Sequence, residues 1–297
     1  MAETLVIDSE LIAGFEPERS GEGHKNNFGT ALICAGSGYM TGAAVLAASS
    51  ALRSGVGLVR VFSEEKVLDA VRFIEPCALL ELRPDDTARL IRKAGELSRI
   101  SDSVLIGPGI PSDYMNMEAL TETFLNGPVN VVLDAGVFSG KPDVMARLKE
   151  QLRKRNVPAV LTPHIGEFAR ITGVDKAEVT ENADDLVLEF SRDNNCVTVL
   201  KSSRTLVATP DGKLYVYDLA NSGLAKGGSG DVLAGLITGF LAQGMEPYKA
   251  SCSAVYIHSM AGKAAADDLG VRYMLPTDLL NYLPEGYSQA GWSDNDD

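Results

Sequence analysis

The 297-residue sequence lacks long apolar runs and an excess of basic residues. It holds 27 Lys and Arg against 40 Asp and Glu, a formal charge of −13, which argues against nucleic acid or an anionic membrane as the main partner. No stretch is apolar over the roughly 20 residues that a bilayer span requires. Residues 1–11 are acidic and lack the basic start and apolar run of a signal peptide. This charge balance favours a small-molecule ligand over a nucleic acid or a membrane. That ligand could be anionic if basic residues gather at its site.

Cysteine and histidine are also scarce. The sequence has three histidines and four cysteines without any C-x-x-C pair, the cysteines being Cys34, Cys77, Cys196 and Cys252. Their neighbours are mostly apolar, so we expect buried, reduced thiols and a cytoplasmic protein. The spacings argue against a metal site built from Cys and His.

Hydrophobic residues make up 45% and charged residues 23% of the chain, as in ordinary globular proteins. No Pro/Ser-rich or strongly polar linker divides it, so we expect one domain over residues 1–297. Residues 1–20 are expected to form an N-terminal preface with a short helix. Residues 288–297 form an acidic tail that we expect to fray.

Short apolar runs alternate with amphipathic stretches along most of the chain. This alternation predicts an α/β fold with a mainly parallel central sheet and helices on both faces. Two runs separated by Pro210-Asp211-Gly212-Lys213 predict a small hairpin at the sheet edge. The expected parallel strands are 30–34, 58–62, 77–81, 103–106, 129–133, 159–161 and 196–200.

The most informative stretch is residues 223–235, G-L-A-K-G-G-S-G-D-V-L-A-G, in which a glycine cluster runs into a helix-like apolar pattern. Glycines allow positive φ and a close backbone approach. The unpaired N–H groups of a helix start favour phosphate. Asp231, in this first turn, is positioned to exchange a proton with a substrate hydroxyl. The alternative is that Ser229 or Asp231 only caps the helix.

Other special residues follow expected strands and would therefore meet at one rim, where ligands bind in parallel sheets. For Asp134 the alternative is turn chemistry, and for His164 it is burial or a helix cap. The glycines near residue 36 could instead be a dinucleotide fingerprint, but the third glycine is displaced to Gly42 and Arg60 stands where an acid is expected. The residues at this rim are Gly36, Gly38, Gly107, Gly109, Asp134 and His164.

Taken in order, the motifs resemble those of the nucleotide-dependent NAD(P)H-hydrate dehydratases of the ribokinase-like superfamily. The resemblance covers about residues 24–284. It rests on H-K at 24–25, F-G at 28–29, G-S-G-Y-M-T-G-A-A at 36–44, G-P-G at 107–109, L-D-A-G at 133–136, T-P-H-I-G-E-F at 162–168, K-S-S-R-T at 201–205 and G-G-S-G-D-V-L-A-G at 227–235. It implies a lyase that uses ADP or ATP to dehydrate the S epimer of NADHX or NADPHX, with release of AMP or ADP and phosphate.

The resemblance also implies site residues. Asp231 would be the catalytic base that deprotonates the ring hydroxyl, and the main-chain amides of an anion hole would hold the transferring phosphoryl group. The anion hole comprises Gly228, Ser229 and Gly230. The nucleotide would contact Lys201, Ser202, Ser203, Arg204, Thr205 and Gly230. The hydrate would contact Ala43, Gly109, His164 and Asp231.

Phosphate chemistry implies Mg²⁺, which Glu167 could reach through water. ADP is the expected co-substrate, a homo-oligomer is expected because symmetric assemblies are common, and no segment is expected to form the epimerase that some relatives carry. Two alternatives stay open: a ribokinase-like kinase of a vitamin precursor or sugar, and a nucleotide-binding protein without turnover.

Overall fold

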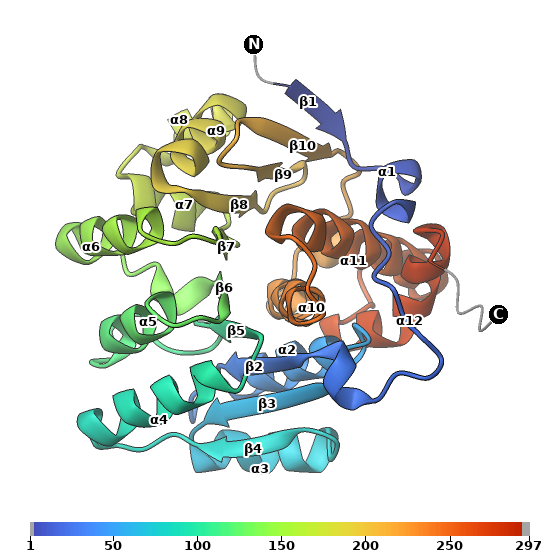
Figure 1. Cartoon of the computed structure of the whole chain (residues 1–297). Helices are drawn as coiled ribbons and strands as arrows, with labels where there is room; N and C mark the ends of the chain where they lie inside the picture. The colour runs from blue at the N-terminus through green and yellow to red at the C-terminus, as the bar shows by residue number, and fades with distance from the viewer. Residues whose placement is uncertain (1–2, 293–297) are drawn as a thin grey trace.

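The computed structural model describes residues 3–292, and all ten strands of this part of the chain belong to one sheet. The strand order is β1-β10-β9-β8-β7-β6-β5-β2-β3-β4, and only β9 runs antiparallel to its neighbours (Figure 1). This confirms the mainly parallel α/β prediction. The strands are β1 (Glu3–Val6), β2 (Thr30–Cys34), β3 (Leu58–Ser63), β4 (Leu79–Leu82), β5 (Ser103–Ile106), β6 (Asn130–Leu133), β7 (Ala159–Leu161), β8 (Cys196–Leu200), β9 (Thr205–Ala208) and β10 (Lys213–Tyr217).

Helices cover both faces of the sheet (Figure 1). One layer is α1 (Ser9–Ala13), α2 (Thr41–Leu52), α3 (Glu65–Ile74), α10 (Ser229–Ala242), α11 (Pro247–Leu269) and α12 (Pro276–Gln289). The other is α4 (Thr87–Arg99), α5 (Met117–Leu125), α6 (Pro142–Arg153), α7 (Ile165–Thr172), α8 (Lys176–Glu181) and α9 (Ala183–Asn194). Short 3₁₀ turns lie at Lys25–Phe28, Ala135–Val137 and Ser222–Leu224.

The apolar strands fill a separate core on each face because successive side chains point to opposite sides of a sheet. In β2, Ile33 packs with the α2, α10 and α11 layer, whereas its neighbours Leu32 and Cys34 pack with the α4, α5 and α6 layer. All three are fully buried. Burial on both faces explains why the strands read as continuous apolar runs.

The expected hairpin forms from β9 and β10, but it does not lie at the edge. β1 pairs in parallel with β10, with Glu3 opposite Lys213, and becomes the outermost strand. The sequence reading missed β1 because a four-residue strand with mostly exposed side chains has no clear periodicity. The helical preface is correspondingly short, Ser9–Ala13, and is capped by the Asp8 side chain.

The predicted fraying of residues 288–297 is wrong for its first half. α12 continues to Gln289, and the Trp292 side chain is buried and donates its indole N–H to the Ile12 carbonyl at 2.9 Å. Trp292 also packs edge-on against Phe240. The Trp292 side chain therefore connects the end of α12 to α1. Residues 293–297 lie outside the described part of the chain.

The thiol prediction is confirmed for three cysteines and wrong for one. Cys34, Cys196 and Cys252 are buried and free, whereas Cys77 is free and exposed, just before β4. Within residues 3–292, no helix combines the length and the apolar content needed to cross a bilayer.

Candidate active site

The glycine loop and the start of α10 adopt the geometry that the sequence predicts. Gly228 is the N-cap residue with φ of +108°, a left-handed conformation in which a Cβ would also lie 2.7 Å from Leu46 Cδ1. Glycine is therefore required for both conformation and space. α10 begins at Ser229, and Asp231 lies in its first turn. Neither Ser229 nor Asp231 is the cap residue, so the simple capping alternative is wrong.

The amides of this turn are partly free. The Ser229 N–H donates to the Lys226 carbonyl at 3.2 Å, and the Asp231 N–H donates to the Gly228 carbonyl at 3.1 Å. The N–H groups of Gly228 and Gly230 donate to no acceptor among the described residues. Unpaired N–H groups at a helix N-terminus carry partial positive charge and attract anions. Of the three amides predicted to form an anion hole, that of Ser229 is already used as a donor within the chain, and those of Gly228 and Gly230 are free to bind a ligand.

A cavity of about 780 Å³ opens in front of this turn. Its polar wall combines the first turn of α10 with residues at the carboxyl ends of β6, β7 and β8, as expected for a parallel sheet. Asp231 lines this cavity and is partly buried. The wall includes Asp134, His164, Glu167, Lys201, Ser202, Ser203, Thr205, Gly228, Ser229, Gly230 and Asp231.

A partly buried ion pair between Asp134 and Lys201 lines the cavity. Lys201 Nζ donates to Asp134 Oδ1 at 2.8 Å, and the same oxygen accepts from Thr162 Oγ1 at 2.7 Å. Asp134 is only 2% exposed. A Cβ on Gly230 would lie 3.2 Å from Lys201 Nζ. The ammonium therefore lies beside the Asp134 carboxylate and next to Gly230 in the first turn of α10.

The charges around Asp231 change its acidity. Burial raises the pKa of this carboxyl from its ordinary 3.8 to about 7, Asp134 adds to the rise, Lys201 opposes it and Glu167 adds to it. Burial alone would lower the pKa of Lys201, but the three carboxylates Asp134, Glu167 and Asp231 raise it. Lys201 is therefore cationic and Asp231 is divided between its two forms near neutral pH. A carboxyl with a pKa near the working pH is suited to general base catalysis.

His164 and Glu167 form a capping box at the start of α7. His164 Nδ1 accepts the N–H groups of Gly166 at 3.0 Å and Glu167 at 3.2 Å, and Glu167 Oε2 accepts the His164 N–H at 2.9 Å. The helix-cap alternative for His164 is therefore correct, but the side chain is also exposed toward the cavity. Burial lowers the pKa of His164, which favours the neutral form of its ring. The Nε2 of this ring lies 3.5 Å from Glu167 Oε1.

The expected nucleotide loop joins β8 to β9. The Ser202 hydroxyl closes this turn by donating to the Arg204 carbonyl and accepting the Arg204 N–H. Arg204 itself does not line the cavity, because its guanidinium pairs with Asp184 of α9. The other four residues of the predicted set, Lys201, Ser202, Ser203 and Thr205, do line it.

Ala43 and Gly109 lie together, but neither lines the cavity of Asp231. Gly109 has φ of +65°, and a Cβ there would lie 2.7 Å from Ala43 Cβ and 2.8 Å from the Met40 carbonyl oxygen. Ala43 occupies the first turn of α2, and Leu46, three residues later, lies against Gly228. The predicted hydrate contacts therefore fall into two groups, with Ala43 and Gly109 on the α2 side and His164 and Asp231 inside the cavity.

The sequence analysis missed one residue that lines the cavity, Asn221, and one that contacts the start of α10, His258. His258 of α11 is buried, and its Nε2 donates to the Ser229 carbonyl at 3.0 Å; burial lowers its pKa to about 4, so the ring is neutral. Asn221 lines the cavity with a buried Nδ2 that finds no hydrogen-bond partner in the described part of the chain, while its Oδ1 accepts the Gly223 N–H. Asn221 precedes the glycine cluster and could have been noticed, whereas nothing in the sequence places His258 against α10.

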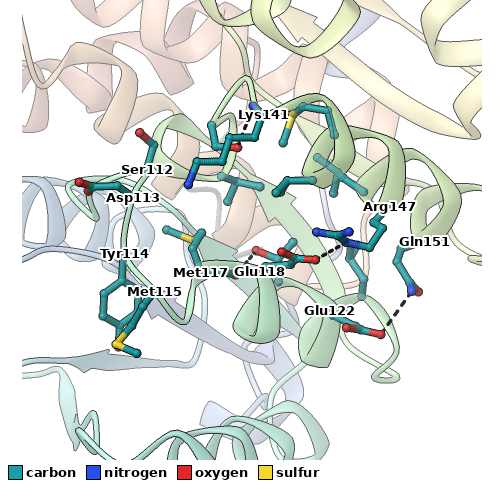
Figure 2. Close-up of a pocket in the computed structure, with 17 residues that line it drawn as sticks. Ser112, Asp113, Tyr114, Met115, Met117, Glu118, Glu122, Lys141, Arg147 and Gln151 are labelled. Atoms are coloured by element: carbon teal, nitrogen blue, oxygen red, sulfur yellow. Dashed lines mark hydrogen bonds and ion pairs between the residues drawn. The ribbon is translucent and has the colours of Figure 1, made fainter.

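A second, smaller cavity of about 160 Å³ lies between α5 and α6 (Figure 2). Its floor is apolar, including Met117, Met145 and Leu148, and its rim carries the Glu118–Arg147 ion pair. None of the residues that the sequence analysis assigned to catalysis or binding lines it. The predicted catalytic residue Asp231 lines the larger cavity and not this one.

Comparison with known sequences gives one consistent result. A family model described as NAD(P)H-hydrate dehydratase matches residues 31–285. The ADP-dependent (S)-NAD(P)H-hydrate dehydratase of Bacillus subtilis is 35% identical over 93% of this chain and 95% of its own length. The bifunctional NAD(P)H-hydrate repair enzyme of Moorella thermoacetica is 34% identical over 90% of this chain, which spans about half (51%) of that protein.

Solved structures agree with this result. The ADP/ATP-dependent NAD(P)H-hydrate dehydratase of Bacillus subtilis, co-crystallised with ATP/Mg²⁺, superposes with a TM-score of 0.83 at 32% identity, covering 96% of this chain and 98% of that one. A hydroxyethylthiazole kinase of Pyrococcus horikoshii has a TM-score of 0.60 at 18% identity, covering 87% of this chain and 89% of its own, and shares the fold alone.

Proposed function

The chain belongs to the NAD(P)H-hydrate dehydratase family, and we propose from this that it dehydrates the S epimer of NADHX or NADPHX with ADP as co-substrate. The observation that carries the proposal is Asp231, a carboxyl with a raised pKa that lines a cavity beside two unpaired helix amides. Names of relatives that combine ADP dependence with the S epimer support the choice of substrate.

The reaction converts a poor leaving group into a good one. Asp231 takes the proton of the ring hydroxyl, and the resulting oxygen attacks the terminal phosphorus of ADP, which breaks the bond to AMP. The free N–H groups of Gly228 and Gly230 donate to the phosphoryl oxygens on which negative charge grows. Phosphate then leaves the ring with the bonding electrons while a ring proton is lost, and the dihydronicotinamide is restored.

Lys201 has two tasks in this scheme. Its ammonium, held by Asp134 at 2.8 Å and next to Gly230, places a positive charge against the nucleotide phosphates. It also stabilises the carboxylate form of Asp231, whose pKa it lowers. Ser202, Ser203 and Thr205 provide the rest of the nucleotide wall. Arg204 stabilises the loop from outside through Asp184.

The hydrated ring lies between the two groups of predicted contacts. Its hydroxyl meets Asp231 and its edge meets the neutral ring of His164, which is exposed at the cavity. Ala43 and Gly109 form a close-packed notch on the α2 side, where a side chain at position 109 would clash with Ala43 Cβ and with the Met40 carbonyl oxygen. This division explains how two distant sequence motifs serve one substrate.

Mg²⁺ fits the carboxylates of the cavity as a phosphate-bound ion. Within residues 3–292 no three His, Cys, Asp or Glu side chains converge on one point, but Mg²⁺ usually takes one or two carboxylates together with phosphates and waters. Glu167 lines the cavity with Oε2 already accepting the His164 N–H, and its Oε1 is suited to a water-mediated contact. When bound, the ion would neutralise charge on the phosphates. Titration with Mg²⁺ in the presence of ADP, with Glu167→Gln as the variant, tests this role.

The direct test is to incubate the protein with purified (S)-NADHX and ADP and to follow the absorbance of the dihydronicotinamide. We expect absorbance to return in step with AMP and phosphate. No return, together with phosphorylation of a vitamin precursor or sugar, would support a kinase instead. Binding of ADP without any product would support a non-catalytic protein. Two further proposals, a cytoplasmic location and a homo-oligomer, are tested by fractionation and by sedimentation velocity.

A further inference from the structure

Arg83 is a buried cation at the carboxyl end of β4, outside the residues assigned so far. Its side chain is 2% exposed, and its Nη2 donates to Glu64 Oε1 at 2.6 Å. Its Nη1 is buried and has no hydrogen-bond partner among residues 3–292. Burial raises the pKa of the adjacent Cys34 thiol to about 11, so that thiol supplies no counter-charge. A buried guanidinium with a single carboxylate partner is costly, which is a reason to ask what it holds in place.

Through Glu64, Arg83 reaches the loop between β2 and α2. The second carboxylate oxygen, Glu64 Oε2, accepts the N–H of Gly38 at 3.1 Å. The same loop contacts the turn after β5, because the Gly36 N–H donates to the Pro108 carbonyl at 2.7 Å. Its Met40 carbonyl lies against Gly109. The ion pair therefore fixes one wall of the Ala43–Gly109 notch.

Arg83 reaches the other wall through an aromatic contact. The guanidinium carbon lies 5.0 Å from the centroid of the Tyr114 ring, within the range of a cation–π interaction. Tyr114 belongs to the segment that follows Gly109: its N–H donates to the Pro111 carbonyl and its carbonyl accepts the Met117 N–H, which leads into α5. Figure 2 shows Tyr114 on this segment, across the small cavity from Gln151.

We propose that Arg83 is a positioning residue for the hydrate: it joins loop 36–40, through Glu64, to loop 111–116, through Tyr114, and so fixes the spacing of Ala43 and Gly109. The inference rests on the proposed function for the identity of the ligand. It concerns the hydrate side of the site only, because Arg83 touches neither the glycine loop nor the nucleotide loop.

The test uses Arg83→Met with Arg60→Met as the matched control. Arg60 also forms an ion pair between β3 and β4, with its Nη1 2.6 Å from Glu81 Oε1, but it holds neither loop. In Arg83→Met we expect the KM for (S)-NADHX to rise roughly 10- to 100-fold, the scale of a misplacement of about 1 Å, with the KM for ADP unchanged. Arg60→Met should alter neither KM.

Tyr114 gives a second pair of variants in case Arg83→Met does not fold. Tyr114→Phe keeps the ring and should match the wild type, whereas Tyr114→Ala should raise the KM for the hydrate alone. Equal changes in both KM values, or a change in kcat alone, would mean a merely structural role and would overturn the proposal.

Hydrogen exchange provides a readout that does not depend on activity. In Arg83→Met and Tyr114→Ala the amides of residues 36–40 and 111–116 should exchange faster than in Arg60→Met, while residues 201–205 stay as in the wild type. Unchanged exchange in both loops would contradict the proposal. If the wild-type protein does not turn over the hydrate, the proposed function is wrong. The exchange data would still decide whether Arg83 joins the two loops.

Discussion

The pH dependence of turnover follows directly from the surroundings of Asp231. With a pKa of about 7, only about one molecule in 100 carries the carboxylate at pH 5, because each pH unit below the pKa changes the ratio of the two forms tenfold. The kcat should therefore fall about 100-fold between pH 8 and pH 5 if the carboxylate is the active form. A carboxyl at its ordinary value of 3.8 would leave the rate almost constant over this range.

Two substitutions should move this acidic limb in opposite directions. Asp134→Asn removes a negative charge that raises the pKa of Asp231, so the limb should move to lower pH. Lys201→Met removes a positive charge that lowers it, so the limb should move to higher pH. Arg204→Met is the control, because Arg204 pairs with Asp184 and does not act on Asp231.

The assay is the initial rate of dihydronicotinamide formation at saturating hydrate and nucleotide, and only the position of the limb is compared. Titration of the nucleotide phosphates is controlled with the residual activity of Asp231→Asn, which should show no limb near pH 7. A flat profile in the wild type would refute the reasoning, and so would a shift of the same sign in Asp134→Asn and Lys201→Met.

The remaining predictions concern stability and the glycine loop. The pKa of Asp231 in the folded protein lies above its ordinary value. Its favourable contribution to the free energy of unfolding is therefore complete below about pH 4 and is lost as the pH rises through about 7. In urea unfolding, Asp231→Asn should therefore be more stable than the wild type by up to about 4 kcal/mol at pH 8, with the difference shrinking toward pH 4; a constant difference would contradict this. Gly228→Ala, at a φ of +108° and against Leu46, should lose about 1–2 kcal/mol of stability as well as activity. In Gly230→Ala the new Cβ would lie close to Lys201 Nζ, so this variant should raise the KM for ADP without a comparable loss of stability. Equal decreases in melting temperature for Gly228→Ala and Gly230→Ala would contradict this prediction.

Local patterns in the sequence were enough to predict the parallel sheet and the glycine loop. The alternation of apolar runs placed β2, β5 and β8 to within a residue, and the cluster of glycines before Val232 marked the start of α10. Both are properties of neighbouring residues, namely strand burial and helix initiation. Asp231 could be singled out for the same reason.

Contacts between distant segments could not be predicted in this way. The Asp134–Lys201 pair exists because β7 lies between β6 and β8 in the sheet, an order that no local pattern specifies. The same applies to Arg83 on Tyr114 and to Trp292 on Ile12, each of which depends on packing across the sheet or between terminal helices. The exposed position of Cys77 likewise reflects tertiary structure rather than its apolar neighbours.

The central claim is that one carboxylate activates the hydroxyl while the nucleotide is held by other groups. It is tested most directly by measuring kcat and ADP affinity together in Asp231→Asn, with calorimetry for the affinity and dihydronicotinamide absorbance for the rate. The account predicts that kcat falls 10²-fold or more while the dissociation constant of ADP stays within a factor of about three, or 0.6 kcal/mol. A variant that retains most of its turnover, or that loses ADP binding in proportion to its rate, would contradict it.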